Sequence, residues 1–239
     1  MTKGKLFDQD LGIIIAADVG EIADLRKLVE LTQIGPEVVG IKVGFSLGLR
    51  YGLPTVLKAI KEVSPIPVIY DHQKAGTDIP QMGKLFAAVC ADAGVSGVIF
   101  FPLSGPKTLD AFVSAAIEAD LTPIVGLVMT HASFLQREGG FIADTAPESI
   151  AEIAVDMGVT HYVLPGTKTD IVSHFAKGRL MRKKPASIMM PGIGSQGGTI
   201  ASAFRAAAPH NPFAIVGSAL YKSADPVAVL RAMIGEMYQ

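Results

Sequence analysis

Short apolar segments alternate with longer amphipathic segments along the chain, and this alternation restricts the possible fold more than any other feature. The apolar segments predict eight strands, at residues 12–18, 38–44, 66–71, 97–101, 123–128, 161–164, 186–190 and 213–217. The segments between and after them have helical spacing, at residues 22–34, 54–63, 81–93, 106–119, 147–157, 170–177, 199–208 and 226–237. Most of the apolar runs are continuous, which is typical of parallel strands covered on both faces.

Strict alternation of strands and helices indicates a parallel sheet of the α/β class. Eight strand–helix units in 239 residues match the count and size of a TIM (β/α)8 barrel. A doubly wound open sheet is the competing architecture. We expect one domain over residues 1–239, because a single core buries more surface than two minimal domains would.

Composition narrows the possible partners and the compartment. The formal charge of -1 excludes a polycation that neutralises nucleic-acid phosphates, and 49% hydrophobic residues exclude a disordered chain. There is no apolar signal-peptide core near the start, and no apolar run approaches the roughly 18 residues of a membrane span. The single cysteine, Cys90, fits a reducing cytoplasm. A mean hydropathy of +0.41 also suggests a face buried against a partner subunit.

Charged residues gather at the ends of the first three expected strands. Asp18, Lys42 and Asp71 lie at or near these ends, and Lys74 and Asp78 follow the third strand. Functional residues of TIM barrels occupy the carboxyl ends of the strands and the loops after them. Buried charges must be paired, so structural ion pairs are one interpretation. Their concentration at one rim favours the other interpretation, a charged active site.

The loops after the seventh and eighth strands are rich in glycine. Residues 190–199, MPGIGSQGGT, lead from a strand into a helix, so bare backbone N–H groups and a helix N-terminus would face the rim. This loop contains Gln196, Gly197 and Gly198, and the next contains Gly217 and Ser218. In TIM barrels these two loops frequently bind phosphate. Tight turns that need positive φ are the alternative reading.

Five segments of the chain, in order, resemble the orotidine 5'-monophosphate decarboxylase family. They are AADVG around Asp18, GIKVG around Lys42, YDHQKAGTDIP at 70–80, MPGIGSQGG, and IVGSALYKSADP near the end. The resemblance covers nearly the whole chain. The glycine loop is quite specific to this suprafamily, whereas the Asp-Lys-Asp loop is shared with 3-keto-L-gulonate 6-phosphate decarboxylases and hexulose phosphate synthases.

The resemblance implies a charge network of Lys42, Asp71, Lys74 and Asp78. In the family the last aspartate comes from the neighbouring subunit, so Asp78 would complete the site of a partner in a homodimer. Asp18 would lie with Lys42 near the ribose hydroxyls of the substrate.

The remaining implied contacts lie further along the chain. Thr130 stands in the place of a family serine that contacts the pyrimidine and the phosphate-loop glutamine, here Gln196. Pro165 matches the proline after the sixth strand. Gly197 and Gly198, with Gly217 and Ser218, belong to the two phosphate loops.

Two departures from the family pattern concern the catalytic loop and the phosphate. Lys74 follows Asp71 by three positions and Asp78 follows it by seven, where the family has two and five. A bulge or turn must therefore absorb two extra residues if Lys74 is to reach the site. Ser218 stands where the family has an arginine that grips phosphate. Three other cations could replace that charge: Arg137, Lys168 and Lys222.

The leading hypothesis is a decarboxylase that converts orotidine 5'-monophosphate (OMP) to uridine 5'-monophosphate (UMP) and CO2, with Lys74 as the proton donor to C6. Lysines supply the positive charge, so this reaction needs neither cofactor nor metal. One alternative is a Mg2+-dependent sugar-phosphate decarboxylase or aldolase of the same suprafamily. A second alternative is a phosphate-ligand binding protein without catalysis. None of the three involves nucleic acid or a membrane.

Overall fold

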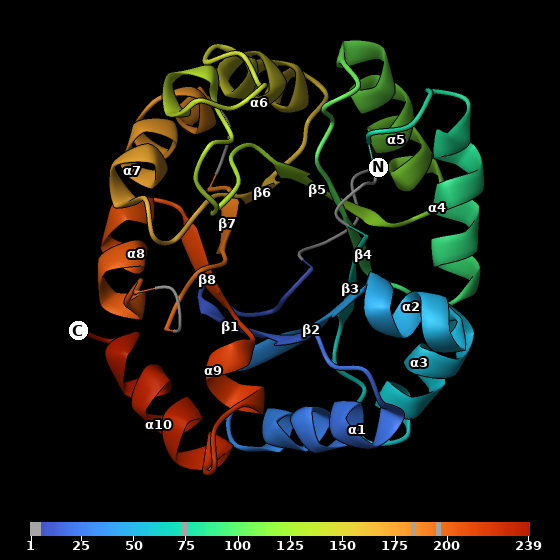
Figure 1. Cartoon of the computed structure of the whole chain (residues 1–239), viewed down its shortest axis with the longest axis vertical. Coiled ribbons are helices and arrows are strands. Elements are labelled where there is room, and N and C mark those ends of the chain that lie inside the picture. The colour runs from blue at the N-terminus through green and yellow to red at the C-terminus, as the bar shows by residue number, and fades with distance from the viewer. Residues whose placement is uncertain (1–5, 73–75, 183–184, 195–196) are drawn as a thin grey trace.

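The computed structural model describes residues 6–72, 76–182, 185–194 and 197–239, and in this part of the chain eight parallel strands close into a barrel (Figure 1). Each strand is hydrogen-bonded to the next, and β8 returns to pair with β1. The TIM-barrel prediction is confirmed, and the open doubly wound sheet is excluded. The strands are β1 Gly12–Ala17, β2 Val38–Gly44, β3 Val68–Asp71, β4 Gly97–Phe100, β5 Thr122–Gly126, β6 His161–Val163, β7 Ser187–Met190 and β8 Asn211–Val216.

Helices surround the barrel and connect its strands (Figure 1). They are α1 Ile22–Glu30, α2 Phe45–Tyr51, α3 Leu53–Lys61, α4 Met82–Asp92, α5 Pro106–Glu118, α6 Ala146–Asp156, α7 Thr169–Lys177, α8 Ile200–Ala207, α9 Ser218–Tyr221 and α10 Pro226–Glu236. Short 3-10 turns occupy η1 Leu31–Gln33, η2 Gln136–Glu138 and η3 Arg179–Arg182. Every expected strand is present, with ends within two residues of the prediction, and every expected helix has a counterpart.

Two helices, α2 and α9, were not predicted from the sequence. Helix α2 has a glycine at its centre and leaves Phe45 and Leu49 exposed, so it lacks the inward-facing apolar stripe that marks a helix in a sequence. Helix α9 is a single turn of four residues. Both follow strand ends, and both contribute residues to the surfaces described below.

The amino end of the barrel is closed by packed side chains. Phe7 lies against Phe213, with ring centroids 4.9 Å apart. These rings belong to an interior cluster of inward-pointing residues, completed by Ile14, Ala16, Val39, Ile69, Ile99, Phe101, Ile124, Val163, Met189 and Ile215. Because this end is filled, a ligand must enter from the carboxyl end of the strands.

A β-bulge in β2 decides which way Lys42 points. Ile13 pairs with Val38, but the next residue of β1, Ile14, pairs with Gly40, so Val39 is an extra residue in the ladder. Val39 belongs to the interior cluster, and Lys42 also faces the interior. Residues three apart cannot share a face of a regular strand, so the bulge turns the lysine inward.

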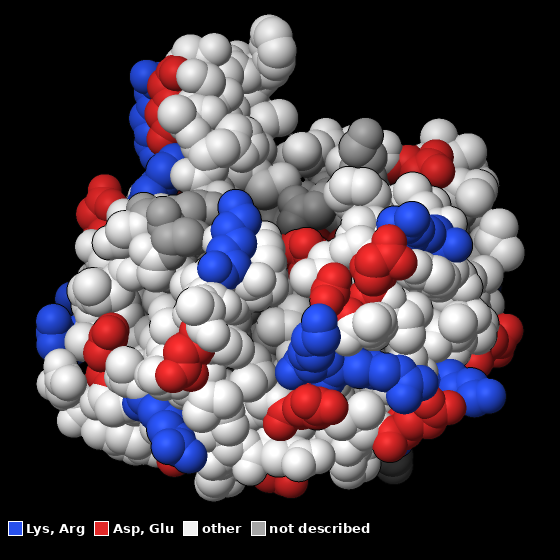
Figure 2. Space-filling view, turned by 60° about the horizontal axis from the view of Figure 1, so that its bottom comes forward, with Lys and Arg blue, Asp and Glu red and all other residues white. Residues whose placement is uncertain are grey.

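Acidic and basic side chains are interspersed on the face shown in Figure 2, without a continuous basic surface among the described residues there. This arrangement agrees with the nearly neutral net charge. Among the described residues, no helix combines the length and hydrophobicity needed to cross a lipid bilayer.

Candidate active site

A cavity of about 380 Å³ opens at the carboxyl end of the barrel. Six of the predicted site residues line it: Asp18, Lys42, Asp71, Thr130, Gly217 and Ser218. They come from the ends of β1, β2, β3, β5 and β8, so the barrel brings together residues that lie up to 200 positions apart in the chain. The cavity is within the size range of pockets that bind small molecules.

Lys42 lies between two carboxylates in this cavity. Its Nζ is 3.0 Å from Asp71 Oδ2 and donates a hydrogen bond to Asp18 Oδ1 at 3.2 Å. The lysine and Asp71 side chains are almost fully buried, whereas that of Asp18 is about half exposed at 49%. The predicted charged cluster is therefore present in part as a hydrogen-bonded Asp–Lys–Asp triad.

The triad keeps Lys42 ionised. Burial by itself would lower the pKa of the ammonium, but the charges of Asp71 and Asp18 and their hydrogen bonds outweigh it, so the pKa is raised above its usual value. A lysine that is charged at neutral pH neutralises part of the negative charge of the two aspartates. The site as described is a paired set of charges, with one ammonium between two carboxylates, and not an isolated buried cation.

The loop after β3 leaves the barrel immediately beyond Asp71. The next residue, His72, points away from the cavity, where its Nδ1 is hydrogen-bonded to the Tyr70 hydroxyl at 2.5 Å. The loop returns at Gly76, which has φ of +85°, and a Cβ there would lie 3.0 Å from Pro102 Cα. Lys74 lies outside the described residues, so its predicted position in the cavity stays a prediction.

Asp78 does not line the cavity of its own chain. It is exposed, its Oδ1 accepts the Ile79 N–H at 2.7 Å, and its carbonyl accepts a hydrogen bond from the Thr108 hydroxyl at 2.9 Å. It lies at a groove of about 690 Å³ between α2, α3 and α4. Leu49 and Leu85 also line this groove and are 75% and 58% exposed. Asp78 therefore faces outward, toward an apolar surface.

The floor and one wall of the cavity are apolar. Phe101 lies across Gly126 of β5, where a Cβ would come within 2.3 Å of the phenyl ring, so only glycine fits at this position. Met129 and Thr130 follow β5 and line the cavity, together with His131. A largely apolar wall excludes water from one side of a bound ligand, which strengthens electrostatic interactions in the cavity.

The glycine loop after β7 is folded onto itself. The N–H of Gly194 donates to the carbonyl of Gly198 at 2.9 Å, and that of Gly197 donates to Gly194 at 3.0 Å. The Gly198 N–H reaches the carbonyl of Gly192 at 3.4 Å. These N–H groups are thus not bare, contrary to the expectation from the sequence. Gln196 lies outside the described residues.

The N-terminus of α8 is also occupied. Glu236 Oε2 accepts the N–H of Ile200 at 3.2 Å, and the Thr199 hydroxyl accepts that of Ser202 at 3.3 Å. The predicted helix N-terminus at the rim is therefore capped by protein groups, because a glutamate on α10 packs against it. Pro191, Gly192 and Ile193 are the described residues of this loop that line the cavity.

Three predicted residues lie behind the cavity lining. Pro165 is buried, and its carbonyl accepts the N–H of Lys168 at 3.0 Å to close a turn. Within this turn the N–H of Gly166 donates to the Pro191 carbonyl at 2.8 Å, so the turn supports the glycine loop. Gly197 and Gly198 stabilise the loop through the bonds described above. The direct contact with a ligand that the sequence predicts for these three residues stays a prediction.

Sequence reasoning missed several residues that line the cavity, among them Phe101, Met129 and Tyr221. Phe101 and Met129 follow strands β4 and β5. They could have been predicted, because apolar as well as charged residues after the carboxyl ends of the strands line the site of a TIM barrel. Tyr221 lies one helical turn after Ser218. It was missed because α9 was not predicted.

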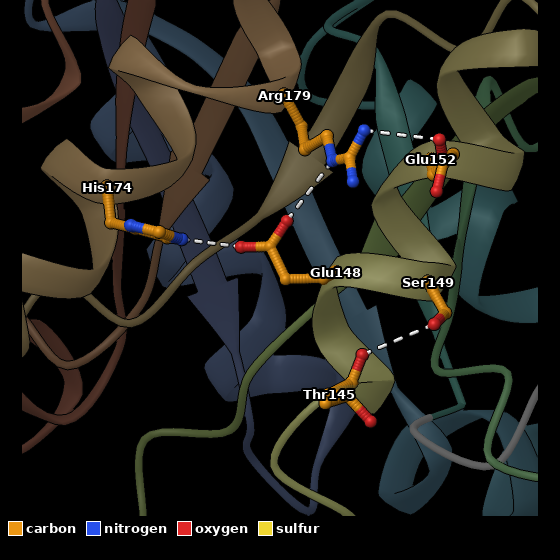
Figure 3. A network of polar contacts seen from close by, with 6 residues as sticks. All are labelled: Thr145, Glu148, Ser149, Glu152, His174 and Arg179. Carbon is orange, nitrogen blue, oxygen red and sulfur yellow. Dashed lines mark hydrogen bonds and ion pairs between the residues drawn. The ribbon is translucent and has the colours of Figure 1, made fainter.

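A network of polar contacts holds α7 and η3 against α6 (Figure 3). Glu148 lies between His174 and Arg179, with its Oε1 2.5 Å from His174 Nε2 and its Oε2 3.4 Å from Arg179 Nε. Arg179 Nη1 also reaches Glu152 Oε1 at 3.1 Å. These residues lie on a polar groove of about 750 Å³ or beside it, and Val128 separates that groove from the cavity by lining both.

The cations proposed as replacements for the family arginine do not line the cavity in the described structure. Arg137 and Lys168 line the polar groove, and Lys168 Nζ is paired with Glu138 Oε1 at 3.0 Å. Lys222 is exposed and absent from the cavity lining. None of the three replaces the missing charge beside Ser218.

The closed parallel barrel defines this chain as a TIM-barrel protein. Its charged cavity lies at the carboxyl end of the strands, which is where TIM-barrel enzymes have their active sites. Residues 12–233 match the family described as Orotidine 5'-phosphate decarboxylase / HUMPS family. The chain belongs to this family.

Similar proteins support the assignment. The chain is 31% identical over 225 residues to an orotidine 5'-phosphate decarboxylase from Methanococcoides burtonii, covering 94% of this chain and 96% of the relative. It is 32% identical over 228 residues to one from Methanosarcina barkeri, covering 94% of each.

Solved structures carry the same fold. The orotidine 5'-phosphate decarboxylase from Pyrococcus horikoshii OT3 superposes with a TM-score of 0.77 at 26% identity, covering 95% of this chain and 99% of that chain. An orotidine 5'-monophosphate decarboxylase from Methanocaldococcus jannaschii, complexed with inhibitor BMP, gives 0.81 at 24% identity, covering 95% and 99%.

Proposed function

We propose that this protein is an orotidine 5'-monophosphate decarboxylase, which converts OMP to UMP and CO2. The observation that carries the proposal is the buried Lys42 ammonium held between Asp18 and Asp71 at the carboxyl end of the barrel. Relatives with this name are 31% and 32% identical over nearly the whole chain. Because both carboxylates already contact an ammonium, the arrangement favours charge balance by lysine over charge balance by a metal ion.

The proposed reaction explains why the site is charged. When the C6–CO2 bond breaks, its electron pair stays on an sp2 carbon that has no adjacent electron sink. The site must therefore stabilise localised negative charge and then supply a proton. A unit-charge pair about 4 Å apart at an effective dielectric of about 20 is worth about 4 kcal/mol. If gained only in the transition state, this is about a thousandfold in rate.

Lys74 is the residue that we propose as the proton donor. In the proposed step its ammonium stabilises the electron pair on C6 and then transfers a proton to that carbon, leaving a neutral amine that is reprotonated from solvent. Asp71 would lie near the substrate carboxylate, whose charge departs with CO2. Lys42 would hold the Asp71 carboxylate in position, as its 3.0 Å contact in the described structure allows.

The wall of the cavity formed by the loops after β7 and β8 would bind the substrate phosphate. Gly192, Gly217 and Ser218 line it there, in the loops after β7 and β8. Binding energy from a phosphate far from the reacting carbon can offset the cost of placing a carboxylate beside Asp71. The phosphate site would thus contribute to catalysis as well as to affinity.

We also propose that the enzyme is a homodimer that shares Asp78 between subunits. The exposed Leu49, Leu85 and Val89 surround an apolar groove, and exposed apolar surfaces of this kind mark protein interfaces. Asp78 lies at the same groove and faces away from its own cavity. A second copy seated on the groove would cover the leucines and receive Asp78 into its site.

The cytoplasm remains the proposed location. Cys90 is buried and unpaired, and burial raises the pKa of its thiol to about 12, so it stays protonated and unreactive at neutral pH. A chain whose only cysteine is inert does not depend on an oxidising compartment.

The decisive experiment follows the ultraviolet absorbance of OMP with purified protein. Loss of the orotate chromophore with stoichiometric CO2 and UMP is the expected result, and turnover should survive EDTA. Loss of activity in EDTA would indicate the metal-dependent sugar-phosphate chemistry of related enzymes. Nucleotide binding without CO2 release would overturn the proposed activity and leave a binding protein.

A further inference from the structure

The cavity has a charged side and an uncharged side. Asp18, Lys42 and Asp71 form the first, whereas the loops after β7 and β8 contribute glycines and hydroxyl groups. Among the described residues of the lining, the side chains that can carry positive charge are Lys42 and His131. Lys42 already contacts two carboxylates, and His131 follows β5, so neither belongs to the β7–β8 wall.

Four backbone N–H groups at or near this wall already donate to protein acceptors. The N–H groups of Gly194, Gly197 and Gly198 donate within their own loop, and that of Ile200 donates to Glu236. An anion that enters the cavity at this wall therefore cannot use these four N–H groups while the described loop keeps its conformation. The residues after β8 that line the cavity, Gly217, Ser218 and Tyr221, present further donor groups to this wall.

Tyr221 supplies a hydroxyl group. It lies three residues after Ser218 in α9, so both residues face the same side of the single helical turn, and both line the cavity. The edge of its ring lies against Gly217, where a Cβ would be 3.5 Å from Tyr221 Cε1. Its hydroxyl has no hydrogen-bond partner among the residues that the structure describes. A half-buried tyrosine hydroxyl without a protein partner is available to a ligand.

We propose that Tyr221 binds the phosphate monoester of the ligand. The O–H of Tyr221 donates a hydrogen bond to a phosphate oxygen beside Ser218, so that uncharged donors bind the anion. The proposal rests on the proposed function for the identity of the nucleotide. A hydrogen bond from a neutral donor to a charged acceptor is strong, so its removal should weaken binding at least about tenfold.

The test compares Tyr221→Phe with the unmodified protein in calorimetric titrations of UMP and of uridine, which lacks the phosphate. We expect UMP to bind at least about tenfold more weakly to the variant, with uridine binding unchanged. The thermal unfolding midpoint should also be unchanged, since the lost hydroxyl has no partner in the described structure. Equal losses for both ligands, or no loss for UMP, would overturn the assignment.

Two control variants test whether the loss of UMP binding is specific to Tyr221. Tyr51→Phe removes a tyrosine hydroxyl that bonds Glu21 on the surface, and Lys222→Ala removes the neighbouring cation outside the cavity lining. Both should bind UMP normally, and a larger loss in Lys222→Ala than in Tyr221→Phe would overturn the proposal.

The titrations need no turnover, so they separate this inference from the proposed function. UMP binding that depends on Tyr221 in a protein unable to release CO2 from OMP would refute only the decarboxylase activity. Failure of the unmodified protein to bind UMP or inorganic phosphate would refute both the assignment of Tyr221 and the proposed function.

Discussion

Lys42 and Asp71 lie on neighbouring strands with Nζ and Oδ2 3.0 Å apart, and their side chains are only 8% and 4% exposed. In the β2–β3 register Lys42 pairs with Ile69, so Asp71 lies two residues further along the same inward face. The long lysine side chain spans the distance of two residues along β3. Each charge is buried, and each therefore depends on the other for compensation.

Replacing Lys42 with methionine should both destabilise the protein and inactivate it. The variant keeps most of the side-chain volume but leaves the Asp71 carboxylate buried without its cation, which costs about 3 kcal/mol in the free energy of unfolding. Urea denaturation measures the loss, and OMP turnover should fall at least about a hundredfold. Lys27→Met is the matched surface control, because the Lys27–Asp24 pair is largely exposed and contributes at most about 1 kcal/mol.

The double variant Lys42→Met/Asp71→Leu separates stability from chemistry. Removing the second charge should recover much of the lost stability while activity stays absent, since an apolar pair replaces an ion pair of similar volume. A double variant as unstable as Lys42→Met would show that packing, and not the buried charge, caused the loss.

Lys74→Ala should abolish CO2 release and leave nucleotide binding measurable. The proposed proton donor contributes mainly in the transition state, so kcat should fall by about a thousandfold or more while the Kd for UMP changes far less. Absorbance kinetics and calorimetry give the two quantities. Normal turnover in this variant would remove Lys74 from the mechanism.

Mixing two inactive variants tests whether Asp78 acts across a dimer. If each site combines Lys74 of one subunit with Asp78 of the other, a mixed dimer of Lys74→Ala and Asp78→Asn chains has one intact site. After equal mixing and re-equilibration, activity should return to about a quarter of the unmodified value, because half of the dimers are mixed. No recovery, despite exchange of subunits shown by mass spectrometry, would place Asp78 outside the partner's site.

Ser218→Arg should tighten substrate binding. A guanidinium beside the β8 loop would add a charge-assisted, bidentate contact to phosphate, so the KM for OMP should fall about tenfold and rise more steeply with salt. Ala224→Arg adds the same charge in the same segment away from the cavity lining and serves as the control. An unchanged KM in Ser218→Arg would mean that the phosphate binds elsewhere.

His161 should make the stability depend on pH between about 4 and 6.5. Burial lowers the pKa of this histidine to about 4, so in that range the unfolded chain binds a proton and the folded chain does not. The stabilising contribution of the neutral His161 to the free energy of unfolding is fully present above the unfolded-state pKa of about 6.5. It falls by about 3 kcal/mol as the pH falls toward 4. Urea denaturation at pH 7 and 4.5 should show a smaller loss in His161→Gln than in the unmodified protein; equal losses would contradict the assignment.

The sequence by itself was sufficient for the eight strands of the barrel and for the two aspartates, Asp18 and Asp71, at their carboxyl ends. Continuous apolar runs such as residues 12–18 and 38–44 become strands because they must be covered on both faces, and that is a local property of the chain. The positions of Asp18 and Asp71 followed from the rule that parallel strands present their carboxyl ends at one face.

The tertiary structure alone decided which side chains meet. The bulge at Val39 that turns Lys42 inward arises from pairing with β1, more than 20 residues away in the chain. The capping of α8 by Glu236 and the placement of Tyr221 beside Gly217 likewise depend on how distant elements pack. The periodicity of one segment carries no information about the register or packing between segments. These contacts therefore cannot be predicted from the sequence of each element alone.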